Sequence, residues 1–394
     1  MKTCRLIKFF LISYLPLIFS GCTHTSSPNQ RVTGDCKLTL SKCSSSQTVI
    51  TATPEETGVL AAHQIRIYKN ISRAQVMQNA QSALRDLGFE PVRSSGRAAV
   101  VEGENSRVLA SSWERGLRMA TNGGLIGGSD HSWTTVLMVF DETAPDIRVR
   151  VELMNTIWDS HGNSETKLVV DPTPYDDLLA RIADPAASQR NTVSQEKRTA
   201  ATERMPPDTG LANKAALNAA QTLTPRRIGG CEVTGLHRCS STQLVQDPSP
   251  ADAALLAELS SRTFPGLSPD QAEVRLRRTL TDLQFQAVSS TSSGIVHGEI
   301  NAEQATRSQR RWRVLTAMLL NKTTGGQGNN AMIGAPDHST LDVVATVAAN
   351  SSPPGSILWL NFRYTVWDSK GDAHSITVID RDLFADVWNR LSTD

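Results

Sequence analysis

The stretch TIWDSHG at residues 156–162 recurs as TVWDSKG at residues 365–371, and this repetition decides the fold. Apolar residues alternate with charged or polar ones just before each stretch: Ile147, Val149, Val151 and Leu153 in the first copy, Leu358, Leu360, Phe362 and Tyr364 in the second. A period of two predicts an antiparallel strand with one buried face. The Asp-Ser-x-Gly bend predicts a turn in which Gly162 and Gly371 take a positive φ.

Other features recur in the same order, which indicates an internal duplication. Each copy has a cysteine pair, an Arg-x-aromatic segment at residues 66–68 or 262–264, and a Ser-x-x-Gln start of a helix. Ser72 with Gln75 and Ser268 with Gln271 predict capping boxes. A final helix is predicted in each copy from 3–4 spacing: Tyr175, Leu178, Leu179 and Ile182 in the first, Phe384, Val387, Trp388 and Leu391 in the second.

We therefore expect an α+β fold with two tandem copies of an antiparallel sheet covered by helices. The predicted organisation is a signal peptide at 1–21, a polar tether at 22–35, repeat A at 36–185, a disordered linker at 186–229 and repeat B at 230–394. The linker is rich in Ala, Thr, Gln, Asn and Pro, a composition that is typical of segments without a packed core.

The N-terminus predicts export. Lys2, Arg5 and Lys8 precede an apolar run at residues 9–19 that is too short to span a bilayer. Ser20 and Gly21 before Cys22 resemble the lipobox of bacterial lipoproteins, although Phe19 stands where that family usually has Leu. The resemblance implies acylation of Cys22, with palmitate among the chains. Since Thr23 rather than Asp follows, it also implies a lipid anchor on the periplasmic face of the outer membrane. An ordinary signal peptide cut near Gly21 is the alternative.

Four cysteines remain beyond Cys22 in the exported chain. They form two close pairs, Cys36 with Cys43 and Cys231 with Cys239, and we expect a disulfide bond in each pair. A metal site is the alternative, but it would need further Cys or His ligands that the two pairs do not share. We therefore expect neither metal nor cofactor.

The Arg-x-aromatic segment, the helix end at residues 84–89 and the aromatic-bearing last helix resemble uncharacterised outer-membrane lipoproteins of proteobacteria. The layout is also similar to the C lipoprotein of the β-barrel assembly machinery, which carries two helix-grip domains after a lipidated tail. The resemblance implies a helix-grip-like domain in each repeat. The cysteine pairs and glycine-rich insertions depart from both comparisons, so no functional residue is carried over.

Some residues could carry chemistry. Residues 130–132 and 337–339 both read Asp-His-Ser, the residue types of a serine hydrolase. Neighbours on a strand point to opposite faces, so we expect a strand entry rather than a triad. Glu104 and Glu299 follow glycines that favour a bulge, and we expect them to be structural. Trp158 and Trp367 are expected to pack in the core.

The charges constrain partners. With 40 basic and 39 acidic residues, no nucleic-acid partner is expected. Arg310, Arg311 and Arg313 flank Trp312 and are predicted to contact peptidoglycan or lipid headgroups, with a solvated helix face as the alternative.

Location and duplication favour a non-enzymatic outer-membrane lipoprotein that acts as an adaptor or accessory subunit of a cell-envelope assembly, with an envelope protein as partner. One alternative is a small-ligand-binding lipoprotein with a cleft between helix and sheet. Another is a hydrolase directed at the cell wall or at lipid, with His131 or His338 as its base.

Overall fold

The computed structural model describes residues 30–33, 45–109, 129–143, 145–159, 162–184, 225–228, 241–290, 294–301, 336–351, 353–368 and 371–393. Cys22, the four paired cysteines and the basic segment with Arg310, Arg311 and Arg313 lie outside these residues. Lipidation, the disulfides and the headgroup contact therefore stay predictions.

Repeat A builds one eight-stranded sheet in the order β1-β2-β8-β7-β6-β5-β4, with β3 paired to β7. Its strands are β1 (Gln30–Thr33), β2 (Gln47–Ile50), β3 (Ile65–Tyr68), β4 (Val92–Ser95), β5 (Val100–Val108), β6 (Ser129–Thr143), β7 (Asp146–Asp159) and β8 (Ser164–Leu168). Its helices are α1 (Pro54–Ala61), α2 (Arg73–Asp86) and α4 (Thr173–Ala183). The pairing is antiparallel except between β2 and β8.

Repeat B follows the same path, β9-β10-β16-β15-β14-β13-β12, with β11 paired to β15. Its strands are β9 (Arg226–Ile228), β10 (Gln243–Gln246), β11 (Ser261–Pro265), β12 (Gln286–Ser290), β13 (Ile295–Asn301), β14 (Pro336–Ser351), β15 (Pro354–Asp368) and β16 (Ala373–Thr377). Its helices are α6 (Pro250–Leu259), α7 (Pro269–Asp282) and α9 (Arg381–Thr393). The parallel pair recurs between β10 and β16.

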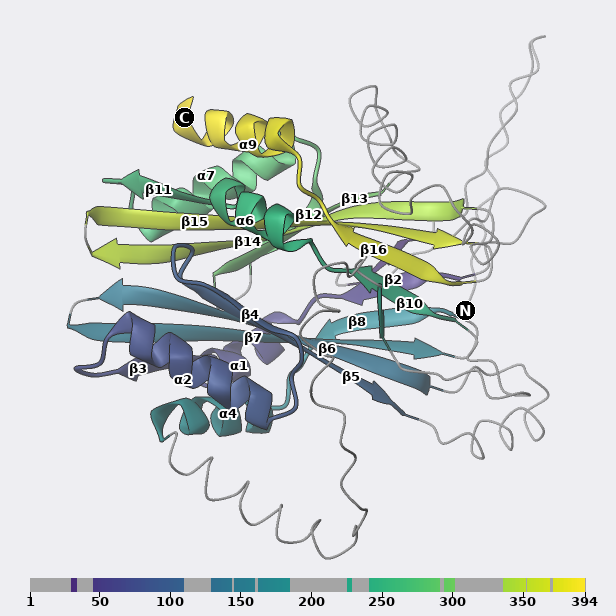
Figure 1. The fold of residues 1–394 in the computed structure, drawn as a ribbon, viewed down its shortest axis with the longest axis horizontal. Coiled ribbons are helices and arrows are strands. Elements are labelled where there is room, and N and C mark those ends of the chain that lie inside the picture. Colours follow the sequence, from purple (N-terminus) through teal and green to yellow (C-terminus); the bar gives the residue numbers. More distant parts are fainter. Residues whose placement is uncertain are drawn as a thin grey trace, which may run out of the picture.

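The two sheets face each other and the helices lie outside them. Figure 1 shows α1, α2 and α4 on the outer face of the repeat A sheet, and α6, α7 and α9 on the outer face of the repeat B sheet. This confirms the expected α+β class with two tandem sheets covered by helices. No helix in the described part of the chain is both long enough and apolar enough to cross a membrane.

The predicted helix signals hold, with one difference. Ser268 and Gln271 form a complete capping box, and Ser72 caps α2 by accepting from the Gln75 backbone N–H. The Gln75 side chain, however, donates to Asn79 Oδ1 at 2.9 Å, so the second half of the first box is missing. The predicted final helices are α4 and α9, and their expected apolar residues are all buried.

Gly103 and Gly298 lie where an added side chain would press on a neighbouring strand. A Cβ on Gly103 would be 3.0 Å from Val136 Cγ1, and one on Gly298 would be 3.0 Å from Val343 Cγ1. The registers of β5 with β6 and of β13 with β14 run through both glycines without a shift. On its other edge, β13 pairs with β12 through a register shift opposite Gly298, so the expected bulge is present beside Gly298 but not beside Gly103. Both glycines allow close packing.

Two strands lie in ranges predicted to be connecting segments. β1 falls inside the tether at 22–35, and β9 falls inside the linker at 186–229. Each pairs antiparallel with the next strand of its own repeat, β2 or β10. Both are short and largely polar, so local patterning gives little sign of them.

The middle of strand β7 is buried on both faces. The alternation predicted one buried face, and Ile147, Val149, Val151 and Leu153 do pack under the helices. On the opposite face, Arg150 is 7% exposed and Glu152 is 2% exposed. The second face is buried because the sheet of repeat B covers it (Figure 1).

Gly162, between β7 and β8, lies against Gly371, between β15 and β16. Gly162 and Gly371 have φ values of 79° and 81°, as predicted. A Cβ on Gly162 would lie 3.1 Å from Gly371 Cα, so the turn of one repeat touches the equivalent turn of the other.

Candidate ligand cavity between the repeats

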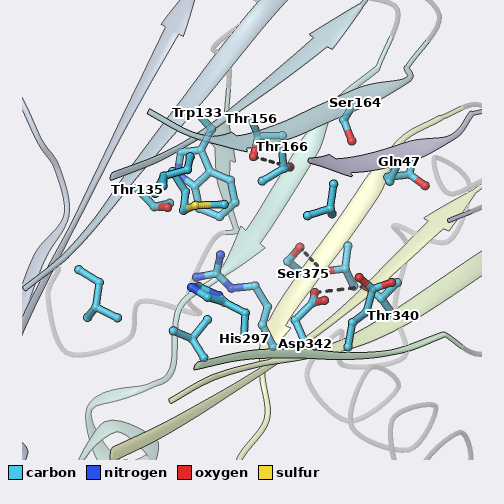
Figure 2. A pocket seen from close by; sticks show the side chains of 18 of the residues that line it. Gln47, Trp133, Thr135, Thr156, Ser164, Thr166, His297, Thr340, Asp342 and Ser375 are labelled. Atoms are coloured by element: carbon cyan, nitrogen blue, oxygen red, sulfur yellow. Dashed lines mark hydrogen bonds between the residues drawn. The ribbon is translucent and has the colours of Figure 1, made fainter. Parts of the chain in front are cut away.

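A cavity of about 430 Å³ lies between the two sheets. Figure 2 shows Trp133 and Thr135 of repeat A across this space from His297 and Asp342 of repeat B. Its apolar wall includes Trp133, Val136, Leu137, Met154, Trp158, Leu168, Val343, Val344 and Trp367. This cavity lies between sheet and sheet, whereas the ligand cleft predicted from the sequence lies between helix and sheet.

Two short strands reach across to the opposite repeat. Arg31 on β1 donates from Nη2 to Glu299 Oε2 at 2.6 Å, and Thr33 Oγ1 donates to Glu299 Oε1 at 2.9 Å. Arg226 on β9 donates from Nη2 to Glu104 Oε2, also at 2.6 Å. Arg31 and Arg226 are 195 residues apart, as are Glu104 and Glu299. The contact is therefore reciprocal: each repeat sends an arginine to the other's glutamate.

Glu104 is the more heavily paired of the two glutamates. Arg93 Nη1 donates to its Oε1 at 2.8 Å, Trp133 Nε1 donates to its Oε2 at 3.2 Å, and Arg363 Nη2 lies 3.8 Å from Oε1. Burial favours a raised pKa for this carboxyl, but Arg363, Arg93 and Arg226 together hold the pKa of Glu104 below its usual range.

A second cross-repeat pair lies next along the sheets. His297 Nε2 lies 2.6 Å from Glu152 Oε1, joining β13 of repeat B to β7 of repeat A. Burial favours a lower pKa for His297, but the Glu152 carboxylate outweighs burial and raises it. Glu102 occupies in repeat A the position that His297 occupies in repeat B. It is hydrogen-bonded to Asn361 of repeat B. Burial raises the pKa of Glu102, against the nearby Arg93.

Asp342 is a cavity carboxyl with a raised pKa. Burial, followed by repulsion from Glu299, raises the pKa of Asp342 to about 7, although Arg31 and Arg363 oppose the shift. Thr340 Oγ1 donates to Asp342 Oδ2 at 3.3 Å. The side chain therefore changes charge near neutral pH.

The two histidines of the Asp-His-Ser triplets each stack on a tryptophan. The ring centroids of His131 and Trp158 are 4.7 Å apart, and those of His338 and Trp367 are 4.8 Å apart, with nearly parallel planes. His338 Nε2 also contacts Gln47 Oε1 on β2 of repeat A. The histidines are buried, and neither is among the residues that line the cavity.

The prediction that strand neighbours point apart is wrong for one pair. The register of β6 and β7 shifts between Ser129 and His131, and His131 Nδ1 lies 3.3 Å from Asp130 Oδ2. The irregularity turns the two side chains toward each other. No hydrogen bond joins Ser132 to His131 in the described part of the chain, so a complete triad does not form there.

The structure places several of the predicted residues at the cavity. Glu104 and Glu299 are brought together with arginines from the opposite repeat, and Trp158 and Trp367 are buried as expected but also line the cavity. The residues missed were Arg31, Arg93, Glu152, Arg226, His297, Asp342 and Arg363. A signal existed for two of them: Arg-x-x-Gly-x-Cys occurs at residues 31–36 and again at 226–231.

This arrangement suits binding: apolar walls exclude water and a few buried ionisable groups fix orientation. Within the described ranges, no group of three His, Cys, Asp or Glu side chains is placed to hold a metal ion. No protein-family model matches this sequence, and no curated protein matches it either.

Proposed function

We propose that this chain is a ligand-binding protein whose ligand occupies the cavity between the two repeats. The observation that carries the proposal is the cavity itself, about 430 Å³ and lined by both sheets. Sites for small organic ligands typically measure about 300–1,000 Å³ and combine apolar walls with a few polar groups. A core that served stability alone would be packed to nearly uniform density, without such a space.

The polar groups of the cavity support the same proposal. Replacing buried charges by apolar residues of similar volume is often neutral or stabilising, so a row of buried carboxylates is not what stability requires. Glu102, Glu152 and Asp342 lie on the cavity wall, and two of them have a raised pKa. Perturbed ionisable groups that cluster in a cavity indicate function.

We further propose the cellular setting that the sequence predicts: lipid attachment at Cys22 and residence at the periplasmic face of the outer membrane. The adaptor role in an envelope assembly rests on this tether and on the duplication, and it stays a prediction beside ligand binding. Hydrolysis with His131 or His338 is not part of the proposal, since neither side chain lines the cavity.

Native mass spectrometry tests the proposal directly. The mature protein, extracted from envelopes and released gently, should carry a small molecule that dissociates on denaturation. Thr135→Trp, which fills the cavity from β6, should remove that molecule. Thr143→Trp at the exposed end of the same strand is the matched control and should keep it. A wild-type protein that carries no small molecule, and takes up none from an envelope lipid and metabolite extract, would refute ligand binding.

A further inference from the structure

We infer that the cavity takes an elongated organic cation, with a protonated amine against Glu152 and a hydrogen-bond acceptor, such as a hydroxyl, at its far end near Trp158. The inference rests on the proposed ligand-binding function and specifies the class of ligand. Four observations carry it: the charge of the lining, an acceptor atom without a donor, an aromatic wall that already holds a cation, and the length of one strand.

The lining carries more carboxylates than cations. Among the described residues, the carboxylates are Glu102, Glu104, Glu152, Glu299 and Asp342, and the cations are Arg31, Arg363 and His297. Arg93 and Arg226 reach Glu104 from outside the lining, but both also pair with Asp247, so they do not remove the excess. Burial raises the pKa of Glu102 and Asp342, and a cationic ligand would favour the charged form of both carboxyls.

Glu152 has an acceptor atom without a donor. Its Oε1 faces His297, while its Oε2 is buried and has no hydrogen-bond partner. The residue is 2% exposed and lines the cavity. A buried carboxylate oxygen without a donor costs free energy, and an ammonium group, which has three donors and no acceptor, matches it.

The aromatic wall is suited to positive charge. Arg363 Cζ lies 4.9 Å from the centroid of the Trp133 ring, in a cation–π contact between the repeats. The chain thus already places one cation against this wall, beside Glu104.

The inner face of β7 sets the length of the ligand. Glu152, Met154, Thr156 and Trp158 alternate along one strand and all line the cavity. Six residues of extended chain place Glu152 and Trp158 about 20 Å apart. The indole Nε1 of Trp158 is buried and has no hydrogen-bond partner, and the residue is 6% exposed. A donor of this kind calls for an acceptor on the ligand, and the residues between call for an apolar chain with few polar groups.

Three probes of one chain length separate the ligand classes. They are an aminodecanol with its amine and hydroxyl at opposite ends, the corresponding decanediol, and the corresponding hydroxydecanoate. Isothermal titration calorimetry on the mature protein, after removal of any resident molecule, should give the tightest binding for aminodecanol, at least about tenfold tighter than decanediol. Hydroxydecanoate should bind most weakly, because its carboxylate would face other carboxylates.

Substitutions then locate the amine. Glu152→Gln keeps an acceptor for His297 but removes the charge, and it should weaken aminodecanol binding about tenfold without changing decanediol binding. Glu165→Gln, an exposed carboxylate on β8 paired with Lys167 at 3.2 Å, is the matched control and should change neither. Glu102→Gln is the second variant if Glu152→Gln does not fold, and it should weaken aminodecanol more than decanediol.

Three results would overturn part or all of the inference. Binding of decanediol or hydroxydecanoate as tight as that of aminodecanol would overturn the cation inference while leaving ligand binding intact. A Glu152→Gln effect equal for amine and diol would overturn the placement of the amine. Binding of none of the three probes would overturn the inference as well. Native mass spectrometry of the protein from envelopes would then decide separately whether the proposed function stands.

Discussion

The two ends of the inter-repeat contact are built differently. At the cavity end the repeats use the same residues: Arg31 and Arg226 are equivalent, and each reaches a glutamate of the other repeat. At the opposite end the equivalent residues differ. Repeat A has Asp141, Arg148 and Arg150 where repeat B has Ala348, Ile357 and Trp359, as the shared strand registers show.

The difference follows from what each contact must bury. Asp141 is 0% exposed, receives Arg150 Nη2 at 2.9 Å, and accepts the backbone N–H of Ala349 in repeat B at 3.0 Å. Ile357 and Trp359 pack into the apolar cluster of repeat A. Two copies of Asp141 facing each other here would bury like charges. A duplicated domain can thus keep reciprocal ion pairs at one end of the contact between its copies, while at the other end one copy differs from the other.

Among the substitutions that compare the two ends, Asp141→Ala should cause the largest loss of stability. The substitution removes the carboxylate that satisfies Arg148, Arg150 and the Ala349 N–H, and it leaves the buried Arg150 without that counterion. We expect the free energy of unfolding to fall by about 3–5 kcal/mol in urea denaturation. Asp146→Ala, at the half-buried start of β7, is the control. A loss no larger than in the control would mean that the asymmetric end does not hold the repeats together.

Asp342→Asn should remove a pH dependence that repeat A lacks, since Thr135 is the equivalent residue there. Burial and Glu299 raise the pKa of Asp342 from 3.8 to about 7, against Arg31 and Arg363, and Asp342 in turn acts on His297. A carboxyl with a raised folded-state pKa binds its proton more tightly in the folded state. Its stabilisation is therefore lost as pH rises from the unfolded-state pKa to the folded-state pKa.

The measurement is unfolding as a function of pH. Between about pH 5 and about pH 8, Asp342→Asn should become more stable relative to the wild type by about 2–3 kcal/mol. Thr135→Val in repeat A should leave the pH profile of the wild type unchanged. A parallel pair of profiles for Asp342→Asn and wild type would place the titration elsewhere in the cavity.

Glu104→Gln and Glu299→Gln should differ from each other, which sharpens the comparison within the symmetric end. Glu104 is met by Arg93, Arg226 and Arg363, whereas Glu299 is met by Arg31 and lies beside Asp342. Loss of Glu104 leaves three cations without it, while loss of Glu299 also relieves repulsion. We expect the free energy of unfolding of Glu104→Gln to be about 1 kcal/mol lower than that of Glu299→Gln, measured from denaturation curves recorded in parallel. Equal losses would show that Arg93 and Arg363, the extra arginines at Glu104, contribute nothing.

The sequence was sufficient to predict the strands, helices and turns that form within a single repeat. Alternation in residues 147–153, the final helices and the turns at Gly162 and Gly371 depend on local sequence, and all were predicted correctly. Features made between the repeats were missed. Glu152 appears in the sequence as a solvent-facing residue of a half-buried strand, and only the second sheet buries it.

The short strands β1 and β9 also depend on contacts between the repeats that local sequence does not predict. Gln30, Arg31 and Thr33 have no apolar periodicity, and Arg31 is held by Glu299, 268 residues away. The repeated Arg-x-x-Gly-x-Cys pattern indicates that these segments are part of the duplicated unit, but not which glutamate each arginine meets. Partner choice across a duplication depends on how the copies pack, which one copy's pattern does not contain.

A pair of double-mutant cycles tests most directly whether Arg31 of β1 forms its ion pair with the opposite repeat. One cycle combines Arg31→Gln with Glu299→Gln, and the other combines Arg31→Gln with Glu104→Gln, each measured by urea denaturation. The structure predicts a coupling of about 1 kcal/mol in the first cycle and none beyond error in the second. Coupling of Arg31 to Glu104, with none to Glu299, would contradict the reciprocal ion pairs between the repeats.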